Sequence, residues 1–457
     1  FDDAGSDSLI GGDFVTAPEI SQIFGETLGI WFAAILQEQS LTAKPWQYVE
    51  AGPGKGSLLV DLVRFWHLLS KAATKRNGIK AAKNIAPTAV HLLETSPQMR
   101  IVQQQSLERD VGNLFDLKFV EPAGVASKTA TEASTDTDGD KVPKAAETPK
   151  EKIKVTGSSG HKPAITIYWH DSISMLQLWQ KQNDSSLPTF AVCQEFMDAL
   201  PIYAFEKTKE GWRERMVDIP LSDEVQKEEL ENLGIKSPPP LEAGQKKLRL
   251  RLVTAPEETP ATRTLLRLNE QGLLPSEAEA GHEAEIGSVV EINPEAILFA
   301  QDMAQMIGQQ GGGALIVDYG QEGSHDSIRA FSQSEQMHFL SRPGKVDVTA
   351  DVDFAALKHA INRYRAPTAE VDPSKIKTAR AYGPVGQGAF LMSNGIKERA
   401  IHLSEQPGAT EEDQENLYKA LVRLCSPDEM GERFKVLAIV PGNSDDPENP
   451  PPGFAPF

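Results

Sequence analysis

A glycine-rich turn between a short apolar strand and a long apolar helix constrains this chain more than any other feature. Residues 46–49 form the apolar run before the turn, and residues 58–65 carry the apolar recurrence of a helix that packs on a sheet. Between these segments lie an acid and three glycines at alternate positions, Glu50, Gly52, Gly54 and Gly56. Glycine permits a sharp turn and lets the backbone lie against a ligand without an intervening Cβ. A strand, a glycine turn and a helix in this order predict a pocket for a nucleotide-type cofactor.

Spacing excludes two nucleotide-binding motifs. A dinucleotide fingerprint needs its third glycine where Ser57 stands, and a P-loop needs Ser or Thr directly after Lys55, where the chain has Gly56. The remaining pattern, E-x-G-x-G-x-G, is the first motif of class I methyltransferases that use S-adenosylmethionine. Turns of this kind also occur as plain connections between a strand and a helix, so the turn alone leaves both interpretations open.

A second acid follows a second predicted strand. Residues 89–93 are mostly apolar and end at Glu94, and Ser96-Pro97 then begins a helix. An acid at this position can accept hydrogen bonds from both ribose hydroxyls, and its negative charge argues against a 2′-phosphate. The polar stretch at residues 71–84 predicts a surface insertion between the two motifs. The alternative for Glu94 is a solvated carboxylate at a strand end.

Several further blocks, in order along the chain, resemble one known family. They are the glycine turn and residues 12–26, 195–201, 317–320, 349–354 and 431–434. Together they resemble the mitochondrial arginine methyltransferases that act in the assembly of respiratory complex I, also called the MidA-like family. The resemblance runs from about Gly12 to about Val440. It departs where the family has a further helix before residue 12, and where residues 123–163 expand a short connection.

The resemblance implies a fold, a cofactor and a substrate. The fold is an α/β class I S-adenosylmethionine-dependent methyltransferase sheet, Rossmann-like, with an inserted, mainly antiparallel β/α region that faces the substrate. The reaction is symmetric dimethylation of an arginine in a core subunit of complex I, in the mitochondrial matrix. The alternative function is a non-catalytic assembly chaperone for complex I that retains cofactor binding. We expect S-adenosylmethionine to be held by Glu50, Gly52, Gly54, Gly56, Glu94 and, at its adenine end, Asp171.

Paired acids after a later strand suit the chemistry of a guanidinium substrate. A guanidinium is always charged in water, so carboxylates must hold it while one nitrogen lone pair is freed to attack the methyl group. Glu195 and Asp198 follow a buried strand at residues 190–194, and they share a face if a helix begins there. We therefore predict that Glu195 and Asp198 are catalytic; the alternative is that either one merely caps the helix. Asp318 and the pair Asp351-Asp353 are the next candidates.

Composition narrows the class of partner. Forty-six basic and sixty-five acidic residues give a net charge of −19, and no basic run is interleaved with aromatic residues. Nucleic acid is therefore a poor partner, and a cationic protein substrate suits this charge better. Two cysteines, Cys193 and Cys425, exclude a disulfide framework and suit a reducing compartment. No apolar run is long enough to predict an integral membrane segment, and no ligand spacing around Asp351 and Asp353 predicts a metal site.

We expect five parts along the chain. Residues 1–45 form an N-terminal helical segment over the cofactor site, with a capping box at residues 16–19. The methyltransferase core follows, and its composition predicts a disordered insertion at about 123–163. The remaining assignments are the core at 46–201, the inserted substrate-facing region at 202–310, the remainder of the core at 311–440 and a flexible Pro-rich tail at 441–457.

Overall fold

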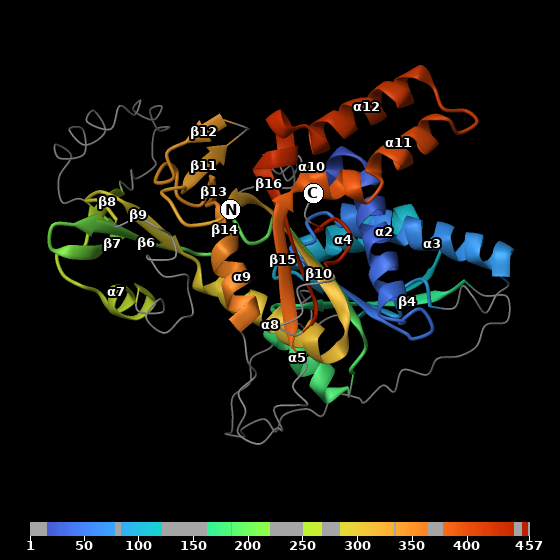
Figure 1. Ribbon diagram of the computed structural model, residues 1–457, viewed down its shortest axis with the longest axis horizontal. Helices are drawn as coiled ribbons and strands as arrows, with labels where there is room; N and C mark the ends of the chain where they lie inside the picture. The colour runs from blue at the N-terminus through green and yellow to red at the C-terminus, as the bar shows by residue number, and fades with distance from the viewer. Residues whose placement is uncertain are drawn as a thin grey trace, which may run out of the picture. The chain divides into compact units, whose positions relative to one another are not determined.

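The computed structural model describes most of the chain (Figure 1). The described residues are 16–77, 84–120, 162–183, 185–219, 250–266, 284–332, 335–363, 378–442 and 450–455. They belong to two compact units, Ser40–Ala191 and Phe1–Gln39 together with Val192–Phe457. Nearly all of the predicted insertion at 123–163, and part of the predicted substrate-facing region at 202–310, lie outside the described residues. The five predicted parts remain a prediction.

The unit Ser40–Ala191 contains a parallel sheet with the strand order β1-β2-β4-β3. Every residue of β1 and β2 is buried, as expected for parallel strands that are covered on both faces. The strands are β1 (Gln47–Ala51), β2 (Ala89–Leu93), β3 (Asp116–Val120) and β4 (Ala164–His170), and the helices are α3 (Ser57–Asn77), α4 (Pro97–Val111) and α5 (Ile173–Gln182). The helix α3 continues through residues 71–77, and residues 71–76 are mostly exposed, so this part of the predicted surface insertion is helical.

Aromatic packing stabilises the start of β1. Trp46 contacts Trp66 and Phe190 edge to face, with ring centroids 5.4 and 5.2 Å apart, and Tyr48 contacts Trp66 at 5.6 Å. All four side chains are almost completely buried. Edge-to-face aromatic pairs contribute beyond the area that they bury. This packing therefore holds β1 against α3, one on each side of the glycine turn.

The other unit begins with two helices, α1 (Ala17–Ile20) and α2 (Gln22–Glu38). The predicted capping box is confirmed, because the Thr16 N–H donates to Glu19 Oε2 at 3.3 Å. The helix that starts at this capping box ends at Ile20, since Ser21 is extended with φ −167° and caps α2. The apolar face of α2 is buried at Ile23, Phe24, Leu28, Trp31 and Ile35.

The strands of this unit include one long buried strand, β10 (Gly312–Gln321). It pairs antiparallel with β16 (Phe434–Pro441), which pairs antiparallel with β15 (Ala379–Gly386), while β14 (Val352–Asp353) runs parallel to β10. The strand β5 (Thr189–Gln194) crosses the boundary between the two units. The helices of the unit are α7 (Pro260–Leu265), α8 (Pro294–Gln310), α9 (Phe354–Arg363), α10 (Gln387–Ser393), α11 (Ile396–Ser404), α12 (Glu411–Cys425) and the π-helix at Pro427–Gly431.

Two smaller sheets also belong to this unit. The predicted antiparallel insertion is confirmed as a four-stranded sheet in the order β8-β7-β6-β9. Its strands are β6 (Tyr203–Thr208), β7 (Gly211–Asp218), β8 (Arg251–Thr254) and β9 (Val289–Ile292). A three-stranded sheet that the sequence does not predict contains β11 (Arg329–Ser332), β12 (Glu335–Met337) and β13 (Asp347–Thr349).

Part of the predicted flexible tail is packed. Phe454 is 8% exposed and its ring lies 5.5 Å from that of Phe390. The indole N–H of the buried Trp31 donates to the carbonyl oxygen of Pro452 at 3.1 Å. The prediction of flexibility is therefore wrong for residues 450–455.

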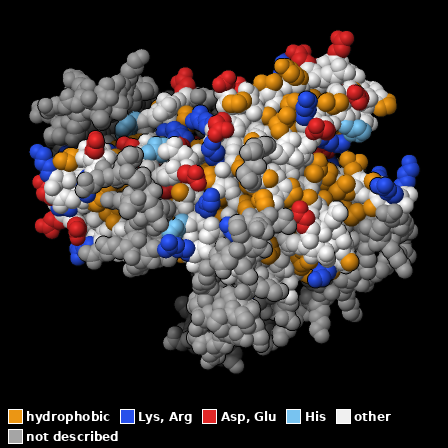
Figure 2. Space-filling view, viewed as in Figure 1, with side chains coloured by type: hydrophobic (Ala, Val, Ile, Leu, Met, Phe, Trp, Pro, Cys, Tyr) orange, Lys and Arg blue, Asp and Glu red, His pale blue; other side chains and the backbone are white. Residues whose placement is uncertain are grey.

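The described surface carries charges of both signs. On the face that Figure 2 draws, acidic and basic side chains are interspersed among apolar ones. Within the part of the chain that the structure describes, no helix is both long enough and apolar enough to span a membrane.

Candidate functional site

The glycine turn has the backbone conformation that its sequence requires. Gly52, Gly54 and Gly56 have φ values of +66°, +50° and +84°, in the left-handed region that other residues rarely adopt. The Gly52 N–H donates to the carbonyl oxygen of Leu93 at 3.3 Å, which ties the turn to the end of β2. A Cβ built on Gly54 would meet no atom within 4 Å. The turn therefore borders open space and can accept a ligand against its backbone.

Glu50 is a buried acid directly before this turn. Its side chain is 3% exposed and accepts a hydrogen bond from the Tyr48 hydroxyl at 3.0 Å. Burial raises the pKa of Glu50 to about 8, because the charged form loses its hydration. A cationic ligand group beside Glu50 would favour the ionised carboxylate, so this residue suits a ligand that carries positive charge.

Glu94 lies at the end of β2 with its carboxylate held in place. Oε1 accepts from the Ser96 N–H at 2.8 Å, and Oε2 accepts from the Gln103 amide at 3.1 Å. Each oxygen of a carboxylate has about two acceptor positions. One position on each oxygen therefore remains for a ligand, which matches the two hydroxyls of a ribose.

Two side chains of α4 connect the predicted cofactor residues. Gln103 donates to the Gly54 carbonyl oxygen at 2.8 Å as well as to Glu94. Arg100, which is 3% exposed, donates from Nε to the Glu94 carbonyl oxygen at 3.0 Å and forms an ion pair with Asp171. Asp171 thus lies beside Glu94 while its side chain stays 56% exposed. The structure brings together the acids after β2 and β4 as predicted.

The sequence does not single out Arg100 or Gln103. Polar residues on a helix most often face solvent, and α4 has few apolar residues to define its buried face. The available signal is their spacing of three residues, which places both on one face directly after the acid Glu94.

A neutral histidine pair lies beside these strand ends. His91 Nδ1 and His170 Nε2 are 3.0 Å apart, and His91 stacks on Tyr168. Burial lowers the pKa of His91 well below its usual value and that of His170 to about 4. Both rings are therefore uncharged at neutral pH and act as packing next to Asp171.

The predicted catalytic residues Glu195 and Asp198 lie in the unit that includes Val192–Phe457, in a turn rather than in a helix. No helix begins after β5, because Glu195 has φ +48° and the Leu200 N–H donates to the Met197 carbonyl oxygen at 3.2 Å. The prediction that Glu195 and Asp198 share a helix face is wrong. Instead the Glu195 N–H donates to the carbonyl oxygen of Val317 at 2.9 Å, so β10 positions the turn.

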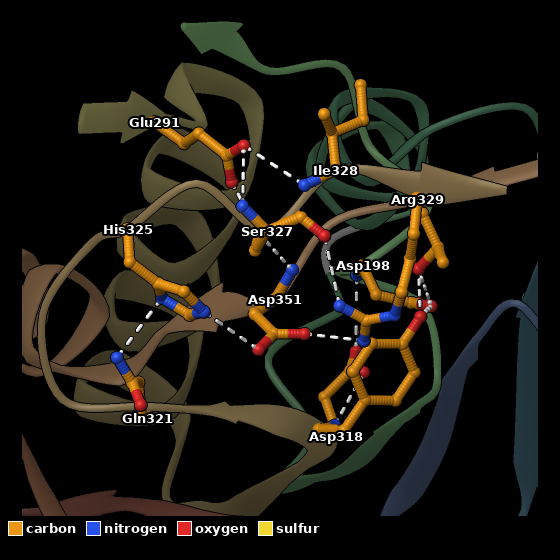
Figure 3. A network of polar contacts seen from close by, with 11 residues as sticks. Asp198, Glu291, Asp318, Gln321, His325, Ser327, Ile328, Arg329 and Asp351 are labelled. Atoms are coloured by element: carbon orange, nitrogen blue, oxygen red, sulfur yellow. Dashed lines mark hydrogen bonds and ion pairs between the residues drawn. The ribbon is translucent and has the colours of Figure 1, made fainter. Parts of the chain in front are cut away.

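Asp318 holds this turn from within the core, and Figure 3 shows it beneath Asp198 in the same network. Its Oδ2 accepts from the N–H groups of Met197 and Asp198 at 3.0 and 3.3 Å, and its Oδ1 accepts from the Tyr319 N–H at 2.9 Å. Burial, with repulsion from Asp198 and Glu195, raises the pKa of Asp318 well above its usual value. Asp318 is completely buried, so it positions the turn rather than contacting a substrate.

Asp198 is oriented by two hydroxyl groups. Its Oδ2 accepts from Thr349 Oγ1 at 2.8 Å and from the Tyr319 hydroxyl. Its Oδ1 has no hydrogen-bond partner among the described groups. The sequence does not predict this role for Tyr319 or Thr349, because they come from separate strands, β10 and β13.

Glu195 is a second largely buried acid in the turn. Its Oε1 accepts from the Gln194 amide at 2.9 Å and from the Ala17 N–H at 3.4 Å. Burial raises the pKa of Glu195 to about 7. No ion pair of the described residues includes Glu195, Asp198 or Asp318. The turn and β10 therefore bring three carboxyl groups together, and no described cation forms an ion pair with them.

The remaining predicted acids already have partners in this unit. Asp351 forms an ion pair with Arg329 at 2.5 Å, and its Oδ2 lies 3.3 Å from His325 Nε2 (Figure 3). The Arg329 guanidinium also lies over the Tyr319 ring, 4.9 Å from its centre. Asp353 accepts the N–H groups of Gly323 and Ala356 at 3.0 and 3.1 Å, so it caps α9. Among the described residues, no three acidic, histidine or cysteine side chains are grouped to hold a metal ion.

A family model described as a putative S-adenosyl-L-methionine-dependent methyltransferase matches residues 27–369. The chain belongs to this methyltransferase family. The predicted fold class, enzyme class and cofactor are thereby confirmed, whereas the roles of individual residues remain predictions.

Curated relatives and solved structures agree with this assignment. Protein arginine methyltransferase NDUFAF7, mitochondrial, from Xenopus tropicalis is 30% identical over 436 residues, covering 94% of this chain and 76% of the relative. The Homo sapiens protein of the same name is 30% identical over 445 residues, covering 94% and 74%. A Burkholderia thailandensis protein with S-adenosyl-homocysteine bound shares the fold with a TM-score of 0.59 at 20% identity, covering 95% of this chain and 80% of that one.

The geometry of the unit Ser40–Ala191 fits the family's cofactor. The open space at Gly54, the acceptor positions of Glu94 and the buried acid Glu50 suit an adenosine joined to a cationic amino acid. These features support the prediction that Glu50, Gly52, Gly54, Gly56, Glu94 and Asp171 would hold it. When bound, S-adenosylmethionine supplies an electrophilic methyl group.

Proposed function

We propose that this methyltransferase acts on a protein arginine, dimethylating it symmetrically in a core subunit of respiratory complex I in the mitochondrial matrix. The relatives named protein arginine methyltransferase, mitochondrial, support the substrate class and the compartment. The observation that carries the proposal is the carboxylate cluster, defined as Glu195, Asp198 and Asp318, which has no bonded cation among the described residues.

The electrostatics of the carboxylate cluster favour a cationic substrate. Burial raises the pKa of Glu195 and of Asp318, and the charge of Asp198 raises the pKa of each further. An approaching cation would favour the ionised forms, since an opposite charge within a few ångströms lowers the pKa of an acid. Binding of a guanidinium would therefore relieve repulsion that the free protein retains.

The shape of the site favours arginine over lysine. A guanidinium is a planar fork with five donors that matches fixed carboxylate oxygens, whereas an ammonium is a compact point charge. Asp198 is held by two hydroxyl donors and by Asp318, so its orientation does not have to be set by the substrate. The Tyr319 ring already carries the guanidinium of Arg329 on one face. Such a rigid carboxylate beside an aromatic ring suits recognition of a planar cation.

The two acids of the turn have separate roles in this proposal. Asp198 binds and orients the substrate guanidinium. Methylation of a guanidinium nitrogen releases one proton, and Glu195, whose pKa is about 7, accepts it when ionised. The Glu195 carboxylate stabilises the charge that develops on the guanidinium without reorganisation, because the Ala17 N–H and the Gln194 amide already hold it in position.

A single-turnover assay tests the proposal with radiolabelled S-adenosylmethionine and purified complex I core subunits. Asp198→Asn and Glu195→Gln keep the side-chain shape and remove the charge, and we expect each to lower the transfer rate by about a hundredfold to a thousandfold. The affinity for S-adenosylhomocysteine should not change. The matched control is Asp326→Asn, because Asp326 is a half-exposed acid of the same unit that pairs with Arg215.

Two results would count against the proposal. Normal rates in both variants would remove the catalytic role of the carboxylate cluster. If the wild-type protein bound a core subunit and transferred no methyl group to it, the assembly-chaperone alternative would replace the enzymatic proposal.

A further inference from the structure

Gln103 has the most specific hydrogen-bonding environment in the unit Ser40–Ala191. Its side chain is completely buried on α4, nearly two turns after the start of the helix. Its amide nitrogen donates to the Gly54 carbonyl oxygen at 2.8 Å and to Glu94 Oε2 at 3.1 Å. Its amide oxygen accepts from the Trp169 indole N–H at 2.8 Å. The two donors and the acceptor of this amide therefore each have a partner.

The three partners leave one possible orientation of the amide. The Trp169 indole can only donate, and the Gly54 carbonyl can only accept. The amide oxygen must therefore face Trp169, and the nitrogen must face the glycine turn and Glu94. Glutamate, methionine or lysine at position 103 could not satisfy all three partners. Only an amide of this length supplies two donors and one acceptor here.

The position of Gln103 links two parts of the cofactor site that are far apart in the sequence. The glycine turn follows β1, while Glu94 follows β2. Gln103 contacts both through one nitrogen atom, and a Cβ on Gly56 would lie 3.7 Å from the Gln103 backbone. The turn, the acid and the helix are therefore packed as one group.

We infer that Gln103 is a positioning residue for S-adenosylmethionine, which sets the orientation of the Glu94 carboxylate relative to the glycine turn. With one acceptor position of Oε2 bonded to Gln103 and one of Oε1 bonded to Ser96, Glu94 presents its free acceptor positions in a fixed direction. A ligand diol then meets acceptors that need no reorganisation, which is the physical basis of affinity gained by preorganisation. This inference rests on membership of the methyltransferase family and does not depend on the proposed arginine substrate.

Arg100 makes the complementary contact one turn earlier on α4. It binds the Glu94 backbone oxygen and the Asp171 carboxylate, so it fixes the main chain of the acid while Gln103 fixes its side chain. The main chain and the carboxylate of Glu94 are thus held from the same face of one helix.

Calorimetry with S-adenosylhomocysteine and the full chain tests this role. Gln103→Met keeps the volume and removes the hydrogen bonds, and we expect the affinity to fall by about tenfold to a hundredfold, the range for a hydrogen bond to a charged group. The matched control is Gln104→Met, because the side chain of the adjacent Gln104 is only partly buried and bonds only Glu108 among the described residues. Its affinity should stay within about twofold of the wild type, since surface substitutions have small effects.

Two further variants separate positioning from simple stabilisation of the fold. Trp169→Phe removes the indole bond to Gln103 and part of a buried ring, but leaves both donors of the Gln103 amide in place, so we expect a lower melting temperature of the free protein with nearly unchanged affinity. Gln103→Glu has almost the same shape, keeps the acceptor for Trp169 and loses both donors. We expect it to bind at least as weakly as Gln103→Met, which keeps the test valid if methionine prevents folding.

A double-variant comparison gives the decisive outcome. If Gln103 acts through Glu94, then Glu94→Ala and the double variant Glu94→Ala with Gln103→Met should bind with affinities within about threefold of each other, because coupled residues are not additive. Affinity in Gln103→Met equal to that of the wild type would overturn the inference. Losses that multiply fully in the double variant would overturn it as well, because the two residues would then act independently.

Discussion

Replacement of Gly54 by valine is the sharpest test of where the cofactor binds. Gly54 has φ +50°, and a Cβ there would meet no atom of the chain within 4 Å. The Cβ of the new residue therefore meets no atom of the chain. The substitution places a branched side chain in the space that we assign to the ligand, so we expect binding of S-adenosylhomocysteine to become undetectable by calorimetry.

The effect of Gly54→Val on folding can be worked out separately. The left-handed conformation costs a residue with a Cβ about 1–2 kcal/mol, and no atom of the chain lies within 4 Å of that Cβ. We expect a decrease in the melting temperature of only a few degrees for a chain of this size. Loss of binding with a nearly normal melting temperature would identify the turn as a contact surface for the ligand.

A second glycine provides the control for strain. Gly408 lies in the turn between α11 and α12, has φ +95°, and likewise has no atom within 4 Å of a built Cβ. Gly408→Val should lower the melting temperature by at least as much and leave the affinity unchanged. Unchanged affinity in Gly54→Val would refute the assignment of the cofactor site. An equal loss of affinity in Gly54→Val and Gly408→Val would mean that destabilisation of the fold, and not contact with the ligand, causes the loss.

Three further predictions concern side chains of the unit that comprises Phe1–Gln39 and Val192–Phe457. Phe454→Ala should destabilise the protein by about 3–5 kcal/mol in urea unfolding, since its ring packs on Phe390; a change below about 0.5 kcal/mol would restore the flexible tail. Arg399 donates to the buried Glu26 carboxylate at 2.6 and 2.8 Å, so Arg399→Met leaves that carboxylate without its partner. We expect the free energy of unfolding to fall by about 3–5 kcal/mol, with unchanged affinity for S-adenosylhomocysteine. An unchanged free energy of unfolding would contradict this. Glu195, whose pKa is raised to about 7 by burial, is protonated below that pH and cannot accept a proton, so the single-turnover rate should rise with pH through about 7. The same rise persisting in Glu195→Gln would assign the titration to another group.

Local patterns predicted the parts of the site that depend on neighbouring residues. The glycine turn, the strands at 47–51 and 89–93, and the helix that starts after Ser96 all follow from short-range chemistry. Glycine spacing specifies the turn, continuous apolar runs specify buried parallel strands, and serine before proline specifies a helix start. These features need no knowledge of distant contacts, so the sequence was sufficient for them.

Distant contacts decided the features that the sequence did not predict. The spacing of the acids favoured a helix at Glu195. Instead, Asp318, more than one hundred residues later, accepts hydrogen bonds from the N–H groups of Met197 and Asp198 and fixes a turn. Gln103 looks like a surface residue until Trp169 and Gly54 are placed beside it. A Pro-rich tail has a flexible composition, but the ring of Phe454 packs on Phe390 and the Trp31 indole bonds the Pro452 carbonyl oxygen, and both contacts hold the described part of the tail. Composition and periodicity carry no information on such partners.

Mass spectrometry of complex I core subunits tests the central claim most directly. The subunits would be isolated from cells that contain the wild-type protein, the Asp198→Asn variant or no protein at all. The account predicts a symmetrically dimethylated arginine in one core subunit with the wild-type protein, and loss of that modification in the other two samples. The same modification at full occupancy in cells without the protein would contradict the account.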